Sequence, residues 1–159
     1  PRALLPPAAI RRPLLCWNRR RTPAKIAEKK EKWDVWQRLL WLAAMGAAGT
    51  VCRYSLDALV VKWCGTKFPW GILVVNGLGC FLFGLIVPLA GERLTISSET
   101  RLILLTGFMG AFTTYSTFTF QTAELMQGSQ WNLAVGNVSA QLVLGLVCMF
   151  GGLALGSRL

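Results

Sequence analysis

The sequence contains no histidine, and only seven of its 159 residues are acidic. Without histidine, neither a His-ligated metal centre nor a Ser–His or Cys–His nucleophile can be assembled. The five cysteines are odd in number and lack CxxC spacing, so they form neither a disulfide framework nor a zinc pattern. Cys52, Cys80 and Cys148 fall in apolar segments and are interpreted as small buried hydrophobes. An enzyme is therefore the least expected class.

The chain has few charges and long apolar runs. Hydrophobic residues make up 53% of it and charged residues 15%, with a mean hydropathy of +0.47. Such a composition is typical of a small helical membrane protein. Apolar windows of about 20 residues, the length that crosses a bilayer, occur at about residues 36–64, 69–90, 98–126 and 131–155. The sequence thus predicts an all-α membrane protein with four transmembrane helices, whose short loops favour antiparallel neighbours.

The net charge of +10 is concentrated near the start of the sequence. Between Arg11 and Arg38 there are ten Lys or Arg against three acids. Residues 1–32 are interpreted as a mobile or peripheral basic tail that contacts anionic lipid headgroups, with no nucleic-acid partner expected. Residues 33–159 are predicted to form the membrane domain.

The positive charges also predict an orientation. One side of the membrane would carry the basic tail with Arg93, Arg101 and Arg158, and the other only Lys62 and Lys67. By the positive-inside rule, both ends of the chain are expected in the cytoplasm, with the domain spanning the cell membrane several times. In a bacterium this would be the inner membrane.

Polar residues inside a span are costly and suggest function. In the first span, Arg53 either snorkels to the interface or is a fixed cation that draws anions into a vestibule. Asp57, four residues on, could pair with it. In the second span, Asn76 either joins helices by hydrogen bonds or donates to a passing anion.

The third span carries the strongest signal, GFMGAFTTYSTFTF at 107–120, with five Thr or Ser hydroxyls within seven residues. Gly107 and Gly110 precede the β-branched pair Thr113–Thr114, a poor sequence for a continuous helix. We expect the third helix to be broken near its centre, where freed backbone groups can coordinate an ion. The alternative is a Ser/Thr-rich helix interface satisfied by the backbone.

Three blocks carry a resemblance to a known family: GAAGTVCRY at 46–54, FPWGILVVNGLG at 68–79, and the third-span block. In this order they resemble the signature blocks of the Fluc (CrcB) fluoride channel family, and the resemblance covers about residues 38–157. It implies an antiparallel homodimer with two pores that export toxic fluoride passively and reject chloride.

The resemblance also implies roles for residues. The backbone carbonyls of Gly110 and Thr113 from both subunits would hold a structural sodium ion at the dimer centre, and Arg53 would line the vestibule. In the fourth span, Asn137, Ser139 and Gln141 are intramembrane polar groups. Of these, Ser139 would extend the hydroxyl track of the fluoride pore, or would join helices by hydrogen bonds. The side chains placed along the fluoride pore are Asn76, Thr114, Tyr115, Ser116, Thr117 and Phe118.

The residues suit this function chemically. Fluoride is small and tightly hydrated, so a pore must replace its water with strong donors, such as an Asn amide and Ser or Thr hydroxyls. Aromatic ring edges carry positive quadrupole. Neutral donors bind weakly enough to let the ion leave, which conduction requires.

The sequence departs from the family pattern in three respects. Tyr115 stands where the family usually has Phe, and Gln121 where it usually has Glu. The strong Lys/Arg bias toward one side opposes insertion in both orientations, which an antiparallel homodimer needs. Removal of the tail, or an oppositely oriented paralogue as partner, would resolve this conflict.

Two other functions fit the class of protein. A small proton- or sodium-coupled transporter is less expected, because it would need titratable side chains within the membrane. Spans two to four lack a membrane-centred carboxylate, and the chain lacks His. A non-conducting accessory subunit would use the basic tail as its working part. Deletion of residues 1–32 distinguishes a channel from an accessory subunit. Channel function should survive the deletion, whereas binding that depends on the tail should be lost.

Overall fold

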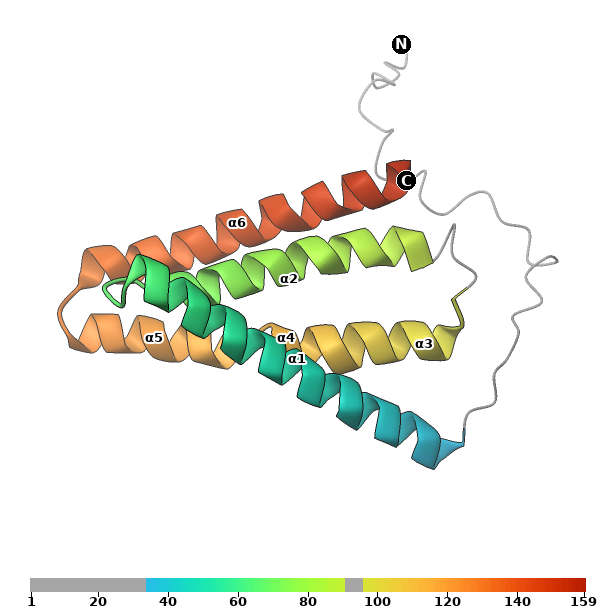
Figure 1. Ribbon diagram of the computed structural model, residues 1–159. Helices are drawn as coiled ribbons and strands as arrows, with labels where there is room; N and C mark the ends of the chain where they lie inside the picture. Colours follow the sequence, from blue (N-terminus) through green and yellow to red (C-terminus); the bar gives the residue numbers. More distant parts are fainter. Residues whose placement is uncertain (1–33, 91–95) are drawn as a thin grey trace, which may run out of the picture.

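The computed structural model describes residues 34–90 and 96–159. The predicted basic tail and Arg93 lie outside the described residues. Within these ranges all regular elements are helical (Figure 1). They are α1 (Val35–Cys64), α2 (Trp70–Pro88), α3 (Ser98–Leu102), the π-helical turn η3 (Ile103–Met109), α4 (Gly110–Phe112), α5 (Tyr115–Gln127) and α6 (Trp131–Arg158).

The prediction of four membrane-spanning helices is confirmed. Four helical stretches of the described residues are long and apolar enough to cross a membrane, the third running from α3 through α5. Their bounds are Val35–Cys64, Trp70–Pro88, Ser98–Gln127 and Trp131–Arg158, within three residues of the predicted spans. The apolar windows therefore located the helices well, because length and hydropathy alone define a span.

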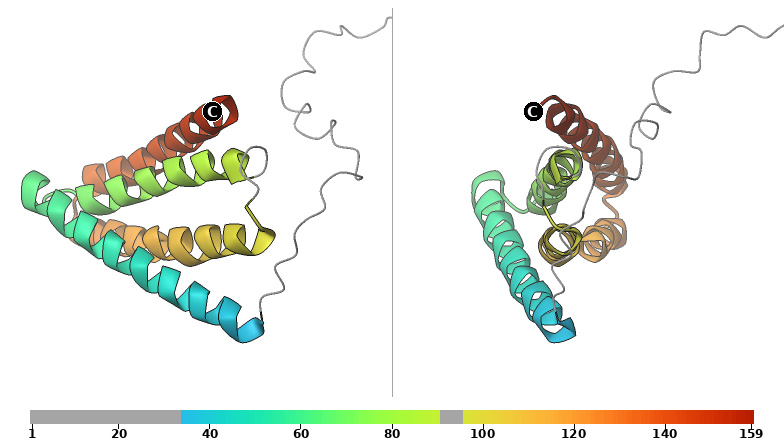
Figure 2. Two further views of the ribbon diagram at one scale, coloured as in Figure 1. Left: turned by 45° about the vertical axis from the view of Figure 1, so that its right-hand side comes forward. Right: turned by 90° about the vertical axis from the view of Figure 1, so that its right-hand side faces the viewer.

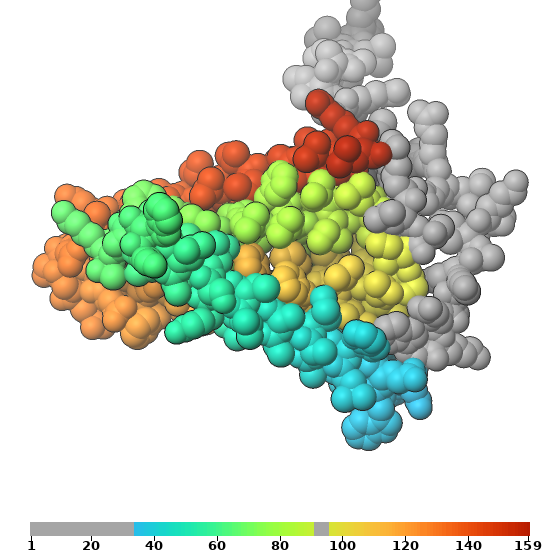
Figure 3. Space-filling view, viewed as in Figure 1, coloured from blue at the N-terminus to red at the C-terminus, as the bar shows by residue number. Residues whose placement is uncertain are grey.

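Helices α2 and α6 lie side by side and run in the same direction, while α1 crosses the third span obliquely (Figures 1 and 2). Glycines permit the close contact of α2 with α6. A Cβ on Gly84 would collide with the Met149 carbonyl oxygen, and one on Gly152 would collide with the Phe81 carbonyl oxygen. These two helices form the tightest part of the bundle. The space-filling view shows α1 lying across one face of it (Figure 3).

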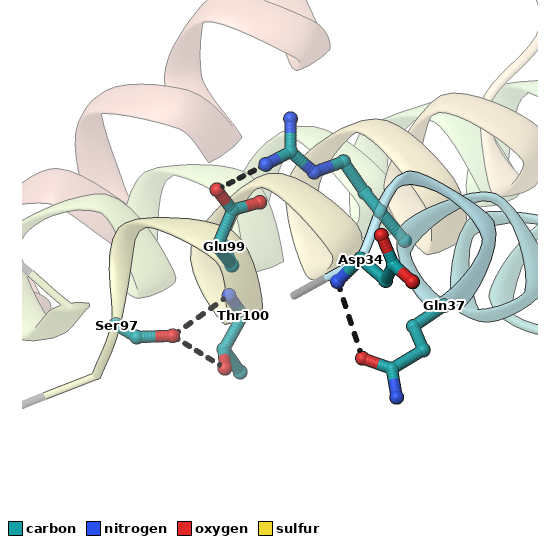
Figure 4. Close-up of polar contacts among 6 residues, drawn as sticks. Asp34, Gln37, Ser97, Glu99 and Thr100 are labelled. Carbon is teal, nitrogen blue, oxygen red and sulfur yellow. Dashed lines mark hydrogen bonds and ion pairs between the residues drawn. The ribbon is translucent and has the colours of Figure 1, made fainter. Parts of the chain in front are cut away.

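The start of α1, the end of α2, the start of α3 and the end of α6 gather at one end of the molecule (Figure 1). This end is fastened by side chains (Figure 4). Arg38 Nη2 of α1 lies 2.6 Å from Glu99 Oε1 of α3. Ser97 Oγ caps α3 by accepting from the Thr100 N–H at 3.2 Å, and Gln37 Oε1 accepts from the Asp34 N–H at 3.2 Å. The positive side chains of Arg101 and Arg158 belong to the same end.

The buried apolar core is small and lies where α2 meets the third span. It contains Val75, Met109 and Phe112. By contrast, α6 exposes large apolar side chains along its length, such as Val143 at 63% and Phe150 at 64%. Apolar surface on this scale would be unfavourable in water and fits a helix that faces lipid or another membrane helix.

Candidate functional site

The third span changes its backbone course at the threonine pair. Helix α4 ends at Phe112 and α5 begins at Tyr115. Between them, Thr113 (φ −81°, ψ 155°) and Thr114 (φ −147°, ψ 118°) have extended backbone. Extended geometry suits β-branched side chains. It also leaves nearby backbone groups without their helical partners, so other groups must satisfy them within an apolar span.

The side chain of Asn76 on α2 forms hydrogen bonds with both backbone polar groups of Thr114. The Thr114 N–H donates to Asn76 Oδ1 at 2.9 Å, and Asn76 Nδ2 donates to the Thr114 carbonyl oxygen at 3.1 Å. The same Nδ2 also donates to Gln141 Oε1 of α6 at 3.2 Å. A carboxamide has one acceptor and two donor hydrogens, so Asn76 engages all of them. It joins α2, the extended segment and α6 at one point.

The hydroxyls of Thr113 and Thr114 form hydrogen bonds with the backbone at the end of α4 and the start of α5. Thr113 Oγ1 donates to the Met109 carbonyl oxygen at 3.0 Å, which fixes its side chain against the preceding turn. Thr114 Oγ1 accepts from the Thr117 N–H at 3.2 Å and so caps α5. The same oxygen lies 3.0 Å from Thr117 Oγ1 and 3.2 Å from Ser116 Oγ. The hydroxyls therefore form a connected cluster.

The extended backbone at Thr113 and Thr114 leaves two carbonyl oxygens without the N–H donors that a continuous helix would give them. In a continuous helix the N–H of residue i donates to the carbonyl oxygen of residue i−4. Thr114 N–H would then serve Gly110, and Thr117 N–H would serve Thr113. Instead they donate to Asn76 Oδ1 and Thr114 Oγ1. The Gly110 and Thr113 carbonyls thus lose their helical donors, which suits them to bind a cation.

A groove of about 360 Å³ lies beside this segment. Asn76, Thr113, Thr114, Tyr115 and Phe118 all line it, and the structure therefore brings these predicted residues together. The Tyr115 and Phe118 rings meet edge to face, with centroids 5.7 Å apart and planes at 61°. Tyr115 stands on the outer rim, 77% exposed. The other lining residues are Gly79, Cys80, Phe83, Gln141, Leu142, Gly145 and Met149.

Gly79 lets the extended segment approach α2. A Cβ at this position would overlap Thr113 Cγ2 and lie 3.4 Å from Phe112 Cδ1. Thr113 cannot easily turn away, because its hydroxyl is bonded to the Met109 carbonyl. The contact of Gly79 with Thr113 could not be predicted from the sequence, because the two residues are 34 positions apart along the chain.

The remaining predicted residues lie outside the groove lining. Ser116 and Thr117 belong to the hydroxyl cluster on α5, Ser139 is exposed on α6, and Arg53 is half-buried on α1. The suggested Arg53–Asp57 pair is not formed: among residues 34–90 and 96–159, the ion pair Arg38–Glu99 is the only one. The Oε1 atom of Gln121, one of the family departures, is buried without a hydrogen bond.

Gln141 lines the groove, although the sequence did not predict a pore role for it. Its Oε1 accepts from Asn76, and its Nε2 is buried with no hydrogen-bond partner. A signal was present, because Asn137 and Gln141 are four residues apart on an otherwise apolar helix and therefore share a face. Asn137 is fully buried and donates to Thr122 Oγ1 at 2.9 Å. This shared face points inward, whereas Ser139 does not.

The chain is similar to known proteins over most of its length. The family model described as "CrcB-like protein, Camphor Resistance (CrcB)" matches residues 40–153. The fluoride-specific ion channel FluC of Nitrosococcus oceani is 57% identical over 118 residues, 74% of this chain and 94% of that protein. The proteins of the same name from Solidesulfovibrio magneticus and Maridesulfovibrio salexigens are 48% and 46% identical, covering 76% and 75% of this chain and 96% and 94% of their own lengths. With four membrane-length helices and these matches, the chain is a multi-pass membrane protein of the CrcB family.

Proposed function

We propose that this protein is a fluoride-selective channel that exports fluoride passively and so reduces its toxicity. The observation that carries the proposal is the groove, in which an intramembrane carboxamide, extended backbone and two aromatic ring edges meet. The curated relatives named as fluoride-specific ion channels support the choice of ion. The protein is a channel and not an enzyme.

The ion path follows the neutral donors of the groove. Fluoride would pass the edges of Tyr115 and Phe118, which present positive quadrupole. It would also meet the hydroxyls of Thr114, Ser116 and Thr117, the unpaired Nε2 of Gln141, and the amide of Asn76 once that amide gives up its hydrogen bond to Gln141 Oε1. None of these groups carries a full charge, so the ion is held by hydrogen bonds and can leave. We place Arg53 in the vestibule, where its charge would attract anions from the aqueous side.

The third span works in this proposal as a helix interrupted at its centre. The Gly110 and Thr113 carbonyls, whose helical donors are directed elsewhere, are hard uncharged oxygens. Such ligands suit a sodium ion better than a soft transition metal. A sodium ion held by these carbonyls from two subunits would give the site a structural role at the subunit interface.

The functional unit in this proposal is an antiparallel homodimer in the cell membrane, the inner membrane if the source is bacterial. A single chain leaves the groove open and Tyr115 exposed at its rim. A second subunit would close it and complete two pores. An oppositely oriented paralogue could fill the same place if the positive charge at the Arg38, Arg101 and Arg158 end fixes one orientation.

Replacement of the inner aromatic ring tests the path. In proteoliposomes with a potassium–valinomycin clamp, Phe118→Ile should slow fluoride efflux about tenfold or more, because losing about 1.4 kcal/mol of ring-edge stabilisation changes a rate about tenfold. Phe150→Ile, at an exposed site of α6 outside the groove, is the matched control and should keep wild-type efflux. Equal efflux from both variants, or chloride release alongside fluoride, would count against the proposal.

Gln141 and Ser139 give a second test, since they lie two residues apart on α6 but only Gln141 lines the groove. Gln141→Leu removes both the acceptor for Asn76 and the unpaired Nε2 donor, and we expect at least about tenfold slower fluoride efflux, from about 1–3 kcal/mol per lost buried partner. Ser139→Ala should change efflux less than about twofold. If Ser139→Ala slowed efflux more than Gln141→Leu did, Ser139 and not Gln141 would be the α6 residue on the fluoride path.

A further inference from the structure

Helices α2 and α6 carry matching Gly-x-x-Cys segments that face each other. The segments are Gly77–Cys80 on α2 and Gly145–Cys148 on α6. A Cβ on Gly145 would lie 3.7 Å from Cys80 Sγ, and a Cβ on Gly77 would lie 3.8 Å from Cys148 Sγ. Each thiol thus sits over the glycine of the opposite helix. Both cysteines are free and half-buried, and both lie where α2 contacts α6.

We propose that Cys80 and Cys148 form a two-thiol site for a soft divalent cation, with mercury(II) as its probe, that bridges α2 and α6. Soft thiolate ligands select soft metals. No group of three or more Cys, Asp or Glu capable of holding a metal occurs in the described part of the chain. The pair therefore suits an ion satisfied by two ligands. Both thiols give up a proton, so that two RSH and Hg²⁺ yield RS–Hg–SR and two H⁺.

Charge balance favours this ion within the membrane domain. The dication and two thiolates form a neutral group, whereas an uncompensated charge in an apolar interior is costly. Hard cations such as sodium or magnesium prefer oxygen ligands and should not compete. The site differs from the proposed sodium site in its atoms, its helices and its chemistry.

One thiol of the pair, that of Cys80, borders the groove. Cys80 lines it, one helical turn after Asn76. A metal held at Cys80 would occupy space beside the path, so mercury should inhibit fluoride efflux. This consequence rests on the proposed channel function, whereas metal binding itself does not.

The binding test uses the full chain with Cys16, Cys52 and Cys64 replaced by Ser, so that only the pair remains. One equivalent of mercury(II) chloride should remove both free thiols in a titration with an aromatic disulfide reagent. The metal should stay bound through a wash with a monothiol. In Cys80→Ser and Cys148→Ser versions of this background, the same wash should release it. Consumption of a single thiol per metal, or mercury-linked pairs of chains, would overturn the site.

Fluoride efflux from proteoliposomes supplies the second measurement. One equivalent of mercury should slow efflux of the pair-only protein about tenfold or more, and dithiothreitol should restore it. The Cys148→Ser version, washed in the same way, should keep its efflux. Bound mercury without any effect on efflux would show that the pair does not border the path. Absence of efflux before mercury is added would instead contradict the channel function, while the thiol titration would still decide the site.

Discussion

Asn76→Asp should abolish fluoride efflux while leaving the protein folded. The substitution keeps the oxygen that accepts from the Thr114 N–H. It replaces the amide that donates to the Thr114 carbonyl and to Gln141 Oε1 with a charged oxygen. Two unit charges about 4 Å apart repel by about 4 kcal/mol at an effective dielectric constant of about 20. Since each 1.36 kcal/mol is tenfold in rate, efflux should fall about a thousandfold.

Asn132→Asp is the matched control for this change. Asn132 is exposed in the first turn of α6, outside the groove, where a negative charge near a helix N-terminus is tolerated. Its fluoride efflux should equal that of the wild type in the electrode assay. Retention of more than about a tenth of wild-type efflux by Asn76→Asp would mean that fluoride does not pass this carboxamide. Elution as a single species in gel filtration would show that the variant had not simply unfolded.

Gly79→Ala should destabilise the protein and slow efflux together, because the methyl group would overlap Thr113 Cγ2. Overpacking of this kind costs about 1–3 kcal/mol, more than the roughly 1 kcal/mol that alanine gains over glycine in a helix. Displacing the Thr113–Thr114 segment from α2 would also disturb the Asn76 contacts. We expect a lower melting temperature in detergent and at least about tenfold slower fluoride efflux.

Two further variants isolate the cause. Gly151→Ala lies on α6 where an added Cβ meets nothing within 4 Å, so it should keep efflux and not lower the melting temperature. Adding Thr113→Ser to Gly79→Ala removes the opposing methyl group and keeps the hydroxyl that bonds Met109, so both properties should recover. If Gly79→Ala behaved like Gly151→Ala, the close contact of α2 with the threonine pair would not exist in the working protein.

Local features of the sequence predicted much of this architecture. The four apolar windows gave the spans, because burial in lipid requires long uninterrupted hydrophobic runs. The glycines and β-branched Thr113–Thr114 drew attention to the segment that lines the groove. The family resemblance placed Tyr115 and Phe118 along one pore, and in the structure their rings are in edge contact.

Long-range pairings could not be predicted in the same way. The Asn76–Thr114 hydrogen bonds join residues 38 positions apart, and the Asn76–Gln141 bond joins residues 65 apart. Both depend on how α2, the third span and α6 pack. The π-helical turn at Ile103–Met109 also has no local signature in the sequence. The groove position of Gln141 depends on the same packing, since it contacts Asn76 across α2 and α6, although helical periodicity places Gln141 on one face with buried Asn137.

The reversal potential of the current through the purified protein tests the central claim most directly. Planar bilayers would separate a solution high in fluoride from one high in chloride, with pH and sodium varied independently. We predict reversal at the fluoride equilibrium potential, unmoved by proton or sodium gradients. Reversal near the chloride potential, or a shift with either cation gradient, would contradict a passive fluoride channel, as would the absence of current from a well-folded protein.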